Sequence, residues 1–383
     1  MNNIVSALGG SVLGYVVPFL FILTIVVFFH ELGHFLVARL SGIRVLTFSL
    51  GFGPELFGFN DRHGTRWKVS AIPLGGYVKF FGDEDAASTP DFQRAAGMDE
   101  GERKVSFFHQ PVGTRAAVVA AGPIANFILA IAILAGIFTF YGRPTPVGSL
   151  ETESARVDAV QEHSAAAAAG FRKGDLVLAI DGKTVSSFSD MQRLVSSSAG
   201  KPLAVEVERD GQRLTLTATP ELREVRGEDG AARHIGVLGI SRSLDVRYDR
   251  VDPLTALRLG VQESWFVADR SLTYLAHVIV GLESPDQLGG PIRIAQVSKQ
   301  VAAVGFVALM HWVAVLSVSI GLLNLFPVPL LDGGHLMFYA VEFVRGRPLS
   351  ERAQEFGFRV GLALVAMLMI VATYNDIRGL VPS

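Results

Sequence analysis

Four long runs of apolar residues divide the chain and predict helices that cross a membrane. A membrane-spanning helix needs roughly 20 apolar residues, so the first three runs are long enough and the fourth is short. They extend from about Val12 to Leu40, from Ala116 to Tyr141, from Val301 to Phe326 and from Phe358 to Ala372. The first run lacks the charged start and the small-residue cleavage site of a signal peptide, so we expect a retained helix.

Basic residues near the ends of these runs predict how the chain is oriented. Loops 41–115 and 327–357, with their borders, carry Arg39, Arg44, Arg103, Lys104, Arg115, Arg345, Arg347 and Arg352. The opposite side carries Arg143, Arg156, Arg293, Lys299 and Arg378. Because cytoplasmic loops are enriched in Lys and Arg, we expect residues 142–300 and both termini to lie outside the cytoplasm.

Short alternating segments between the first and second runs predict β structure. We expect strands at Val45–Leu50, Trp67–Ile72 and Tyr77–Phe81, separated by glycines. Residues 41–82 are also rich in phenylalanine, and two interpretations stay open. The segment is either a soluble hairpin packed on its own aromatic side chains, or a membrane-associated β-hairpin whose backbone is covered by protein or faces a wet cavity. Residues 83–111 begin acidic and then become mixed in charge, as expected of a solvated loop.

Residues 146–222 predict a separate soluble domain between the second and third runs. Its strand-like segments are Arg156–Val160, Leu176–Ile180, Leu203–Glu208 and Leu214–Ala218, with a helix-like segment at Phe188–Ser198. The sequence Ala169–Asp175, followed by a strand and a tight turn at Asp181-Gly182, resembles the core of a PDZ domain. PDZ domains bind extended peptide ends by strand addition, but a structural or steric role is also open.

The following residues, 223–299, predict a linker and an amphipathic helix. Over 253–283, apolar residues recur at helical spacing among charged ones, so this helix either lies at the membrane surface or packs within the protein. The predicted order is an N-terminal membrane part at 1–145, the soluble domain, this linker with its helix, and a C-terminal membrane part at 300–383. The expected fold class is a polytopic α-helical membrane protein with an inserted α+β domain.

Composition agrees with a membrane protein and restricts its chemistry. Half of the residues are hydrophobic and only 18% are charged, which is unusual for a soluble protein. The formal net charge of -2 gives no reason to expect nucleic acid as a partner. Because the sequence has no cysteine, disulfides and thiolate zinc sites are excluded, and His, Asp or Glu would have to hold any metal.

The motif His30-Glu31-Leu32-Gly33-His34 lies near one end of the first apolar run. Residues i and i+4 of a helix share a face, so both imidazoles can reach one zinc ion. Glu31 can then accept a proton from the hydrolytic water and return it to the leaving amine. A charge at the centre of a membrane helix costs roughly 2.5–3.5 kcal/mol, and a shared metal would offset this cost. The alternative is a hydrogen-bonded cluster without metal.

A third protein ligand is expected, because zinc enzymes typically use three and leave one position open. The third run ends in Asn324-Leu325-Phe326-Pro327-Val328-Pro329-Leu330-Leu331-Asp332-Gly333-Gly334-His335. Asp332, between apolar residues and glycines, has the surroundings of a buried metal carboxylate, and His335 is the rival ligand. The predicted orientation brings both motifs to the same side of the membrane.

Taken together, these motifs resemble the site-2 protease family, in its branch of bacterial regulator-of-sigma-E proteases. Beyond the HELGH and NLFPVPLLDGGH sequences and the PDZ domain, the resemblance extends to Gly75–Lys79, Ala121–Asn126 and Leu288–Ile292. It implies that His30, His34 and Asp332 bind Zn²⁺ and that Glu31 is the catalytic acid and base. It also implies that Asn324 assists at the active site. The substrate would pair with a β-element formed by Gly75, Gly76, Tyr77, Val78 and Lys79.

The same resemblance implies an intramembrane zinc metalloprotease of the bacterial inner membrane, with its PDZ domain on the periplasmic side. Its partners would be the lipid bilayer, a peptide ligand of the PDZ domain, and single-span substrates such as trimmed anti-sigma factors or remnant signal peptides. Some relatives carry two tandem PDZ domains, whereas only one is predicted here. A zinc-binding transporter would not need Glu31 beside a ligand. A non-catalytic PDZ scaffold would have no use for HExxH facing an intramembrane aspartate.

Overall fold

The computed structural model describes residues 2–83, 97–147, 154–226, 232–242, 245–285 and 289–379. The chain forms two compact units, one made of Met1–Phe140 with Val251–Ser383 and the other of Tyr141–Arg250. The second unit extends beyond the expected domain of 146–222, because residues up to 249 add strands to it. The expected linker at 223–299 therefore differs from the structure, which has strands up to residue 249 and then two helices.

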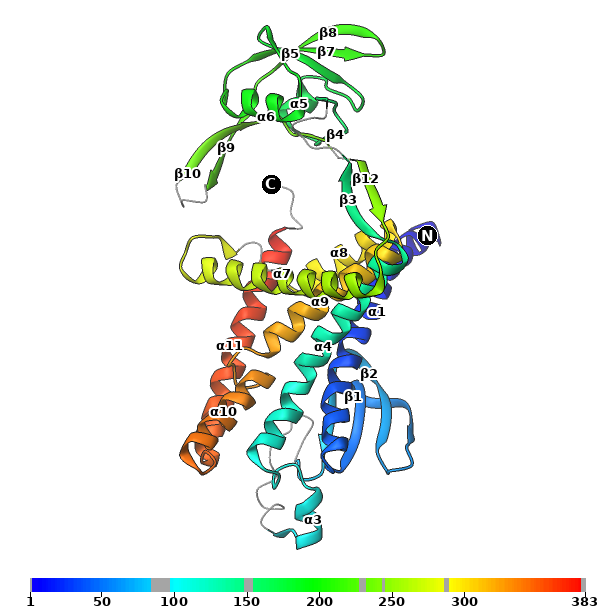
Figure 1. Cartoon of the computed structure of the whole chain (residues 1–383), viewed down its shortest axis with the longest axis vertical. Coiled ribbons are helices and arrows are strands. Elements are labelled where there is room, and N and C mark those ends of the chain that lie inside the picture. The colour runs from blue at the N-terminus through cyan, green and yellow to red at the C-terminus, as the bar shows by residue number, and fades with distance from the viewer. Residues whose placement is uncertain are drawn as a thin grey trace. The chain divides into compact units, whose positions relative to one another are not determined.

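Four helices of the first unit are long and apolar enough to cross a membrane, as predicted. They are α1 (Asn2–Leu40), α4 (Val112–Phe140), α9 (Phe306–Asn324) and α11 (Glu351–Arg378) (Figure 1). The third helix begins later than expected, because Gly305 separates α9 from a preceding helix, α8 (Pro291–Val304). Leu288, part of the motif quoted before α8, lies outside the described residues.

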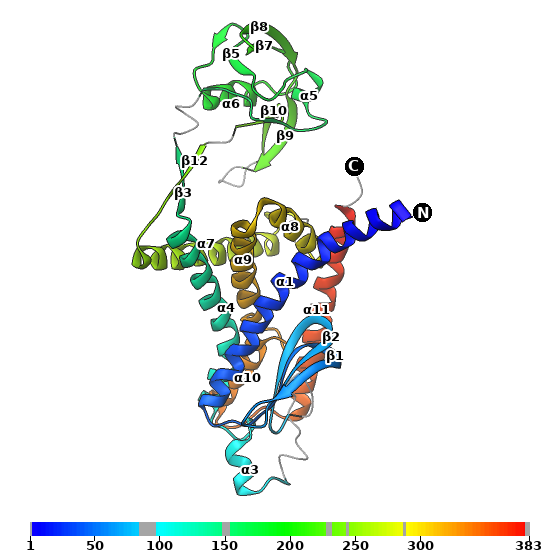
Figure 2. The ribbon, with the colours of Figure 1, turned by 90° about the vertical axis from the view of Figure 1, so that its right-hand side faces the viewer.

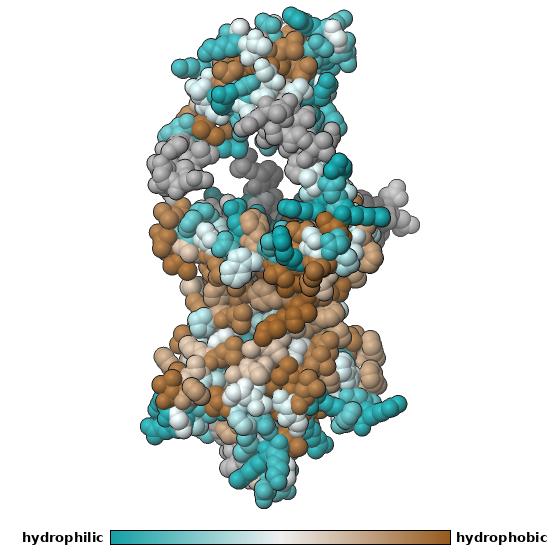
Figure 3. Space-filling view, viewed as in Figure 1, coloured by the Kyte–Doolittle hydropathy of each residue, from teal (hydrophilic) through white to brown (hydrophobic). Residues whose placement is uncertain are grey.

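Helix α4 is the centre of this unit and packs against α1, α7 (Pro253–Ile279), α9 and α10 (Asp332–Arg345) (Figure 2). Small residues allow close packing, since a side chain at Gly33 of α1 would collide with the Ala121 carbonyl of α4. Large apolar side chains gather on the outside of the helices (Figure 3). An apolar exterior of this extent fits a surface that faces lipid.

The expected amphipathic helix is α7, and it packs in an unexpected way. Its buried residues are all small, namely Ala256, Gly260, Ser264 and Ala268. Its large apolar residues, including Leu254 and Trp265, are exposed. The helix therefore packs on α4 through small residues and also presents an apolar face, and its position at a membrane surface stays a prediction.

The predicted β structure is present as two long strands, β1 (Val45–Asn60) and β2 (Arg66–Phe80). Both strands change register along their length, so that residues 47–50 of β1 pair with 66–69 and also with 76–79 of β2. The three expected strands are thus segments of this sheet, and residues 55–60 form a fourth segment that was not predicted. Of the predicted solvated loop at 83–111, residues 84–96 lie outside the described residues, and α3 (Glu100–Val105) follows them.

Aromatic residues of this sheet occupy two environments. Phe48 is buried, stacks on Trp67 with 4.3 Å between ring centroids, and belongs to a core shared with Phe35 of α1. Phe57 and Phe59 are exposed near the other end of β1. One end of the segment therefore packs on α1, a contact that neither the soluble-hairpin nor the membrane-hairpin interpretation specified. Its association with the membrane stays a prediction.

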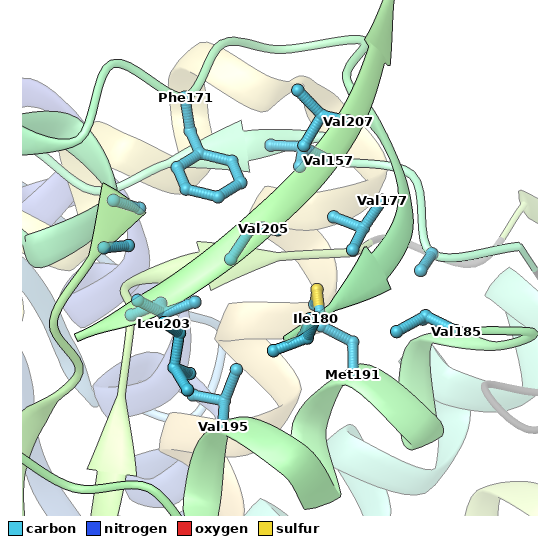
Figure 4. Close-up of a cluster of buried hydrophobic side chains, with 14 of the residues drawn as sticks. Val157, Phe171, Val177, Ile180, Val185, Met191, Val195, Leu203, Val205 and Val207 are labelled. Atoms are coloured by element: carbon cyan, nitrogen blue, oxygen red, sulfur yellow. The ribbon is translucent and has the colours of Figure 1, made fainter. Parts of the chain in front are cut away.

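The second unit has the predicted PDZ arrangement. Its main sheet has the order β6-β5-β7-β8, formed by β5 (Leu176–Ile180), β6 (Lys183–Thr184), β7 (Leu203–Arg209) and β8 (Gln212–Ala218). The helices are α5 (Ala165–Ala168) and α6 (Phe188–Ser196). Valines of β5 and β7 pack against Ile180, Met191 and Val195 in its apolar core (Figure 4).

Further strand pairs complete this unit, and two of them join strands that are distant in sequence. β3 (Arg143–Val147) pairs with β12 (Asp245–Asp249), and β4 (Ala159–Val160) pairs with β11 (Ile240–Ser241). β9 (Glu221–Arg226) forms a hairpin-like pair with β10 (Ala232–Val237). These pairings close the domain on the strands through which the chain enters and leaves it.

A buried ion pair stabilises the predicted PDZ core sequence. The Asp175 carboxylate accepts two hydrogen bonds of 2.7 Å from Arg209 and one of 2.9 Å from the Arg172 N–H. Burial by itself would raise the pKa of Asp175, but these donors outweigh it and hold the pKa below its usual value. The carboxylate therefore stays charged at neutral pH and ties the Ala169–Asp175 turn to β7.

Candidate metal centre and active-site cavity

A cavity in the first unit brings together residues from distant parts of the sequence. Its lining includes His30, Glu31 and His34 of α1, residues 75–78 of β2, Asn324 at the end of α9, and Asp332 and His335 of α10. All of them were predicted from the sequence as site residues, His335 as the rival ligand. Lys79, which was also predicted, is not among the lining residues. The cavity lies among helices that can span a membrane.

The side chains of His30, His34 and Asp332 could hold a metal ion. Asp332 Oδ2 lies 3.2 Å from His30 Nε2 and 3.5 Å from His34 Nε2, and the two Nε2 atoms are 3.3 Å apart. Tetrahedral zinc with ligands at 2.0–2.1 Å requires about 3.3–3.4 Å between ligand atoms. The three atoms therefore already have the spacing of three corners of a zinc tetrahedron.

Hydrogen bonding at this cluster also fits a metal. His34 Nδ1 lies 2.9 Å from the Val118 carbonyl oxygen, to which it can only donate, so Nε2 keeps its lone pair. Among the described residues, Asp332 Oδ2 is buried and has no hydrogen-bond partner. A buried carboxylate oxygen without a donor is costly, and a cation bound between it and the two imidazoles would remove that cost. The residues present therefore fit zinc.

The segment before α10 positions Asp332. Helix α10 begins at Asp332, and Leu331 precedes it directly. Leu330, one residue earlier, has a φ of 117°, which is rare for residues other than glycine. Gly333 and Gly334 leave no room for a side chain, because a Cβ at either would collide with backbone carbonyls of residues 325–328. This packing explains why two glycines follow Asp332.

His335, the rival ligand, does not join the three converging atoms. Its ring packs 5.5 Å from Phe358 and 6.5 Å from Tyr339, measured between centroids. It still lines the cavity, one turn along α10 from Asp332. The geometry thus favours Asp332, in agreement with the chemical argument from the sequence.

Glu31 and β2 approach each other at the cavity. Glu31 is 9% exposed, and a Cβ at Gly76 would lie 3.0 Å from Glu31 Cγ. Residues 76–79 pair with β1 along one edge, and no described strand pairs with the other edge of residues 76–78. Asn324 lines the same cavity, and its amide makes no hydrogen bond to the described residues. A free strand edge, a carboxylate and a free amide therefore surround one space.

Helix α4 also contributes to the site. Gly122 and Asn126 belong to the Ala121–Asn126 sequence that carries the family resemblance, but the sequence assigned them no role, and Val118 lies outside that sequence. Gly122 faces both imidazoles, and a Cβ there would lie 2.9 Å from His30 Cε1 and still closer to His34 Nε2. Val118 acts through its backbone, which leaves no signature in a sequence. Asn126 lies 3.3 Å from His30 and could have been suspected as a polar residue inside an apolar run.

An ion pair fixes α10 to α4. Arg115 donates to Glu342 at 2.6 Å, both side chains are largely buried, and the guanidinium lies 4.8 Å from the centre of the Tyr339 ring. Removing one partner of a buried pair typically costs about 3–5 kcal/mol, whereas an exposed pair contributes about 0–1 kcal/mol. Arg115→Ala should therefore lower the thermal midpoint of the detergent-solubilised protein.

The exposed pair Lys104–Glu100 on α3, outside the membrane-spanning helices, provides the control. Lys104→Ala should leave the stability within about 1 kcal/mol of the wild type, with little change in the midpoint. Equal midpoints for both variants would show that the Arg115 pair contributes nothing to the docking of α10.

Comparison with known proteins identifies the family of this chain and several relatives. The model of peptidase family M50 matches residues 18–368. A Rhizobium meliloti (strain 1021) protein named "Putative zinc metalloprotease" is 51% identical, over 96% of this chain and 98% of the relative. Metalloprotease MmpA of Caulobacter vibrioides is 40% identical, over 94% and 95%. The regulator of sigma-E protease RseP of Salmonella typhimurium is 31% identical, over 96% and 99%.

Among solved structures, the PDZ domain of an SdrC-like protein from Listeria monocytogenes matches at 19% identity and a TM-score of 0.18. The match covers 25% of this chain and 92% of that domain.

Proposed function

The chain belongs to peptidase family M50, the site-2 protease family, and on this premise we propose that His30, His34 and Asp332 hold the zinc ion of an intramembrane metalloprotease. The convergence of their three ligand atoms at 3.2–3.5 Å carries this proposal. Membership of a peptidase family does not fit the alternatives of a zinc transporter or a non-catalytic scaffold. The relatives also agree with a multi-pass protein of the bacterial inner membrane.

In this proposal, Glu31 moves the protons of peptide hydrolysis. Zinc, when bound, polarises a peptide carbonyl and lowers the pKa of water. Glu31 follows a ligand directly and lines the same cavity, so it can accept a proton from the attacking water and deliver it to the leaving amine. The free amide of Asn324 can donate to the substrate backbone as charge develops on the carbonyl oxygen.

The free edge of β2 supports a proposal for how substrate is held. A membrane helix hides its carbonyls in its own hydrogen bonds, so the substrate must unwind before hydrolysis. An unwound segment can pair with residues 76–78, which lie beside Glu31 and which no described strand pairs with along their second edge. We expect single-span membrane proteins as substrates, including anti-sigma-factor-like proteins or remnant signal peptides.

Proline substitutions test this strand pairing. Adjacent residues of a strand point their N–H groups to opposite edges. Of the two variants Tyr77→Pro and Val78→Pro, one therefore removes a hydrogen-bond donor from the free edge and the other removes a donor from the edge that faces β1. We expect the variant without the free-edge donor to lose cleavage of a single-span reporter in liposomes while it keeps its zinc content. Leu56→Pro, at an exposed position without a register partner in the same sheet, is the control. Cleavage at the wild-type rate by both test variants would exclude pairing along this strand.

We further propose a peptide-binding role for the second unit, on the periplasmic side. A groove lies between α6 and the segment that includes β10 and β11, lined by Met191, Val195 and residues 235–240. A strand beside a helix is the arrangement in which a peptide adds to a sheet edge. The periplasmic placement is supported by the excess of Lys and Arg in loops 41–115 and 327–357, because such an excess marks the cytoplasmic side and residues 142–300 are predicted on the opposite side.

Two neighbouring substitutions test the groove. Ile235 lines it and is half-buried, whereas His234 is exposed and points to the other face of β10. Ile235→Asp should abolish capture of peptides with apolar carboxyl termini by the full-length protein, and His234→Asp should not. If the wild type captures no such peptide, the domain has a structural or steric role instead.

A further inference from the structure

Asn126 is a buried polar residue in the middle of the membrane helix α4. It is 0% exposed, and its backbone carbonyl accepts a hydrogen bond of 2.8 Å from Ser317 of α9. Its side-chain Oδ1 is buried and has no hydrogen-bond partner among the described residues. A polar side chain at such a position is expensive unless it is paired, so its retention calls for a partner.

The partner is His30. The Asn126 side-chain nitrogen lies 3.3 Å from His30 Nδ1, while His30 Nε2 faces Asp332 and His34. An imidazole that binds a metal through Nε2 carries its proton on Nδ1 and needs an acceptor there. Half a turn of the Asn126 amide exchanges its nitrogen and oxygen, which have nearly the same shape, and places the unpaired Oδ1 at this proton.

The arrangement repeats what is seen at the other histidine. His34 and His30 are one turn apart on α1, and Val118 and Asn126 are four residues to either side of Gly122 on α4. Residues spaced by four and eight lie on one face of a helix, so α4 presents an acceptor to each imidazole with a glycine between them. The Val118 acceptor is a carbonyl, and the matching acceptor for His30 is the Asn126 amide oxygen.

We propose that Asn126 is a positioning residue of the metal centre, which accepts a hydrogen bond from His30 Nδ1–H and so holds His30 Nε2 toward the metal. The inference rests on the proposed role of His30 as a ligand. Loss of such an outer partner typically weakens metal affinity about 10–100-fold. Asn126→Leu should therefore weaken zinc binding by about that factor, whereas Asn126→Asp, which keeps an acceptor, should restore affinity to within a few-fold of the wild type.

The test is zinc affinity of the full-length protein in detergent, measured by competition with a chelator. Ser317→Ala removes the neighbouring hydrogen bond to the Asn126 backbone and is the control for packing, with unchanged affinity expected. If Asn126→Leu does not fold, Asn126→Ala must show the same weakening. Wild-type affinity in the variants without an acceptor, or equal weakening in the aspartate variant, would overturn the inference.

His30→Ala separates this inference from the proposal beneath it. If His30→Ala keeps its zinc, the ligand assignment itself fails. If His30→Ala loses zinc but Asn126→Leu binds it as tightly as the wild type, only the positioning role of Asn126 fails.

Discussion

Glu31→Gln is expected to abolish proteolysis while leaving zinc bound. Glutamine has nearly the same shape as glutamate and fits the same buried position, but it cannot accept a proton. General acid–base catalysis contributes roughly 10²–10⁴-fold to a rate, so cleavage should fall by about that factor or more. The measurement is cleavage of a single-span reporter in liposomes, together with zinc content determined on the same preparation.

The same substitution at an exposed glutamate is the control for Glu31. Glu351 begins α11, is exposed and lies outside the cavity, so Glu351→Gln should cleave at the wild-type rate. Equal cleavage by the Glu31 variant and the wild type would show that another group moves the proton. Loss of zinc from the Glu31 variant would instead give this residue a role in holding the metal.

Gly122→Ala is expected to remove zinc and activity together, although it adds only one methyl group. The new Cβ would collide with the Nε2 atom of His34, which is one of the three converging ligand atoms. The ring cannot easily move aside, because its Nδ1 is held by the Val118 carbonyl at 2.9 Å. Zinc content after purification, and cleavage of the single-span reporter, should both fall to a small fraction of the wild-type values.

Another glycine of the same helix provides a close control. A Cβ at Gly136 would have no neighbour within 4 Å, so Gly136→Ala should keep both zinc and activity. If Gly122→Ala also retains full zinc, then α1 and α4 can separate without loss of the site. The close contact between these helices would then not be needed to form it.

The parts of this protein that could be predicted from sequence are those with a local pattern. Apolar runs locate the membrane helices, and the spacing of His30 and His34 places both rings on one helix face. Asp332 could be proposed because a carboxylate among apolar residues is costly to bury unless a cation or a hydrogen-bond donor compensates its charge. In each case, residues close together in sequence carry the whole signal.

The rest depends on contacts between distant segments. The pairing of residues 143–147 with 245–249 joins strands about a hundred residues apart, and no periodic pattern of residues within either strand predicts it. Val118 supports His34 through its carbonyl oxygen, a group that every residue has. The packing of α7 through small residues was hidden because its larger apolar residues dominate the helical pattern.

X-ray absorption at the zinc edge of the purified protein tests the central claim most directly. We predict one zinc per chain in a four-coordinate site, with two imidazole nitrogens and oxygen at about 2.0–2.2 Å. Since the sequence has no cysteine, no thiolate sulfur should be seen. Replacing Asp332 by alanine should remove the metal or change this coordination. Absence of zinc from a folded protein, or an unchanged spectrum after Asp332→Ala, would contradict the assignment of His30, His34 and Asp332 as the metal centre.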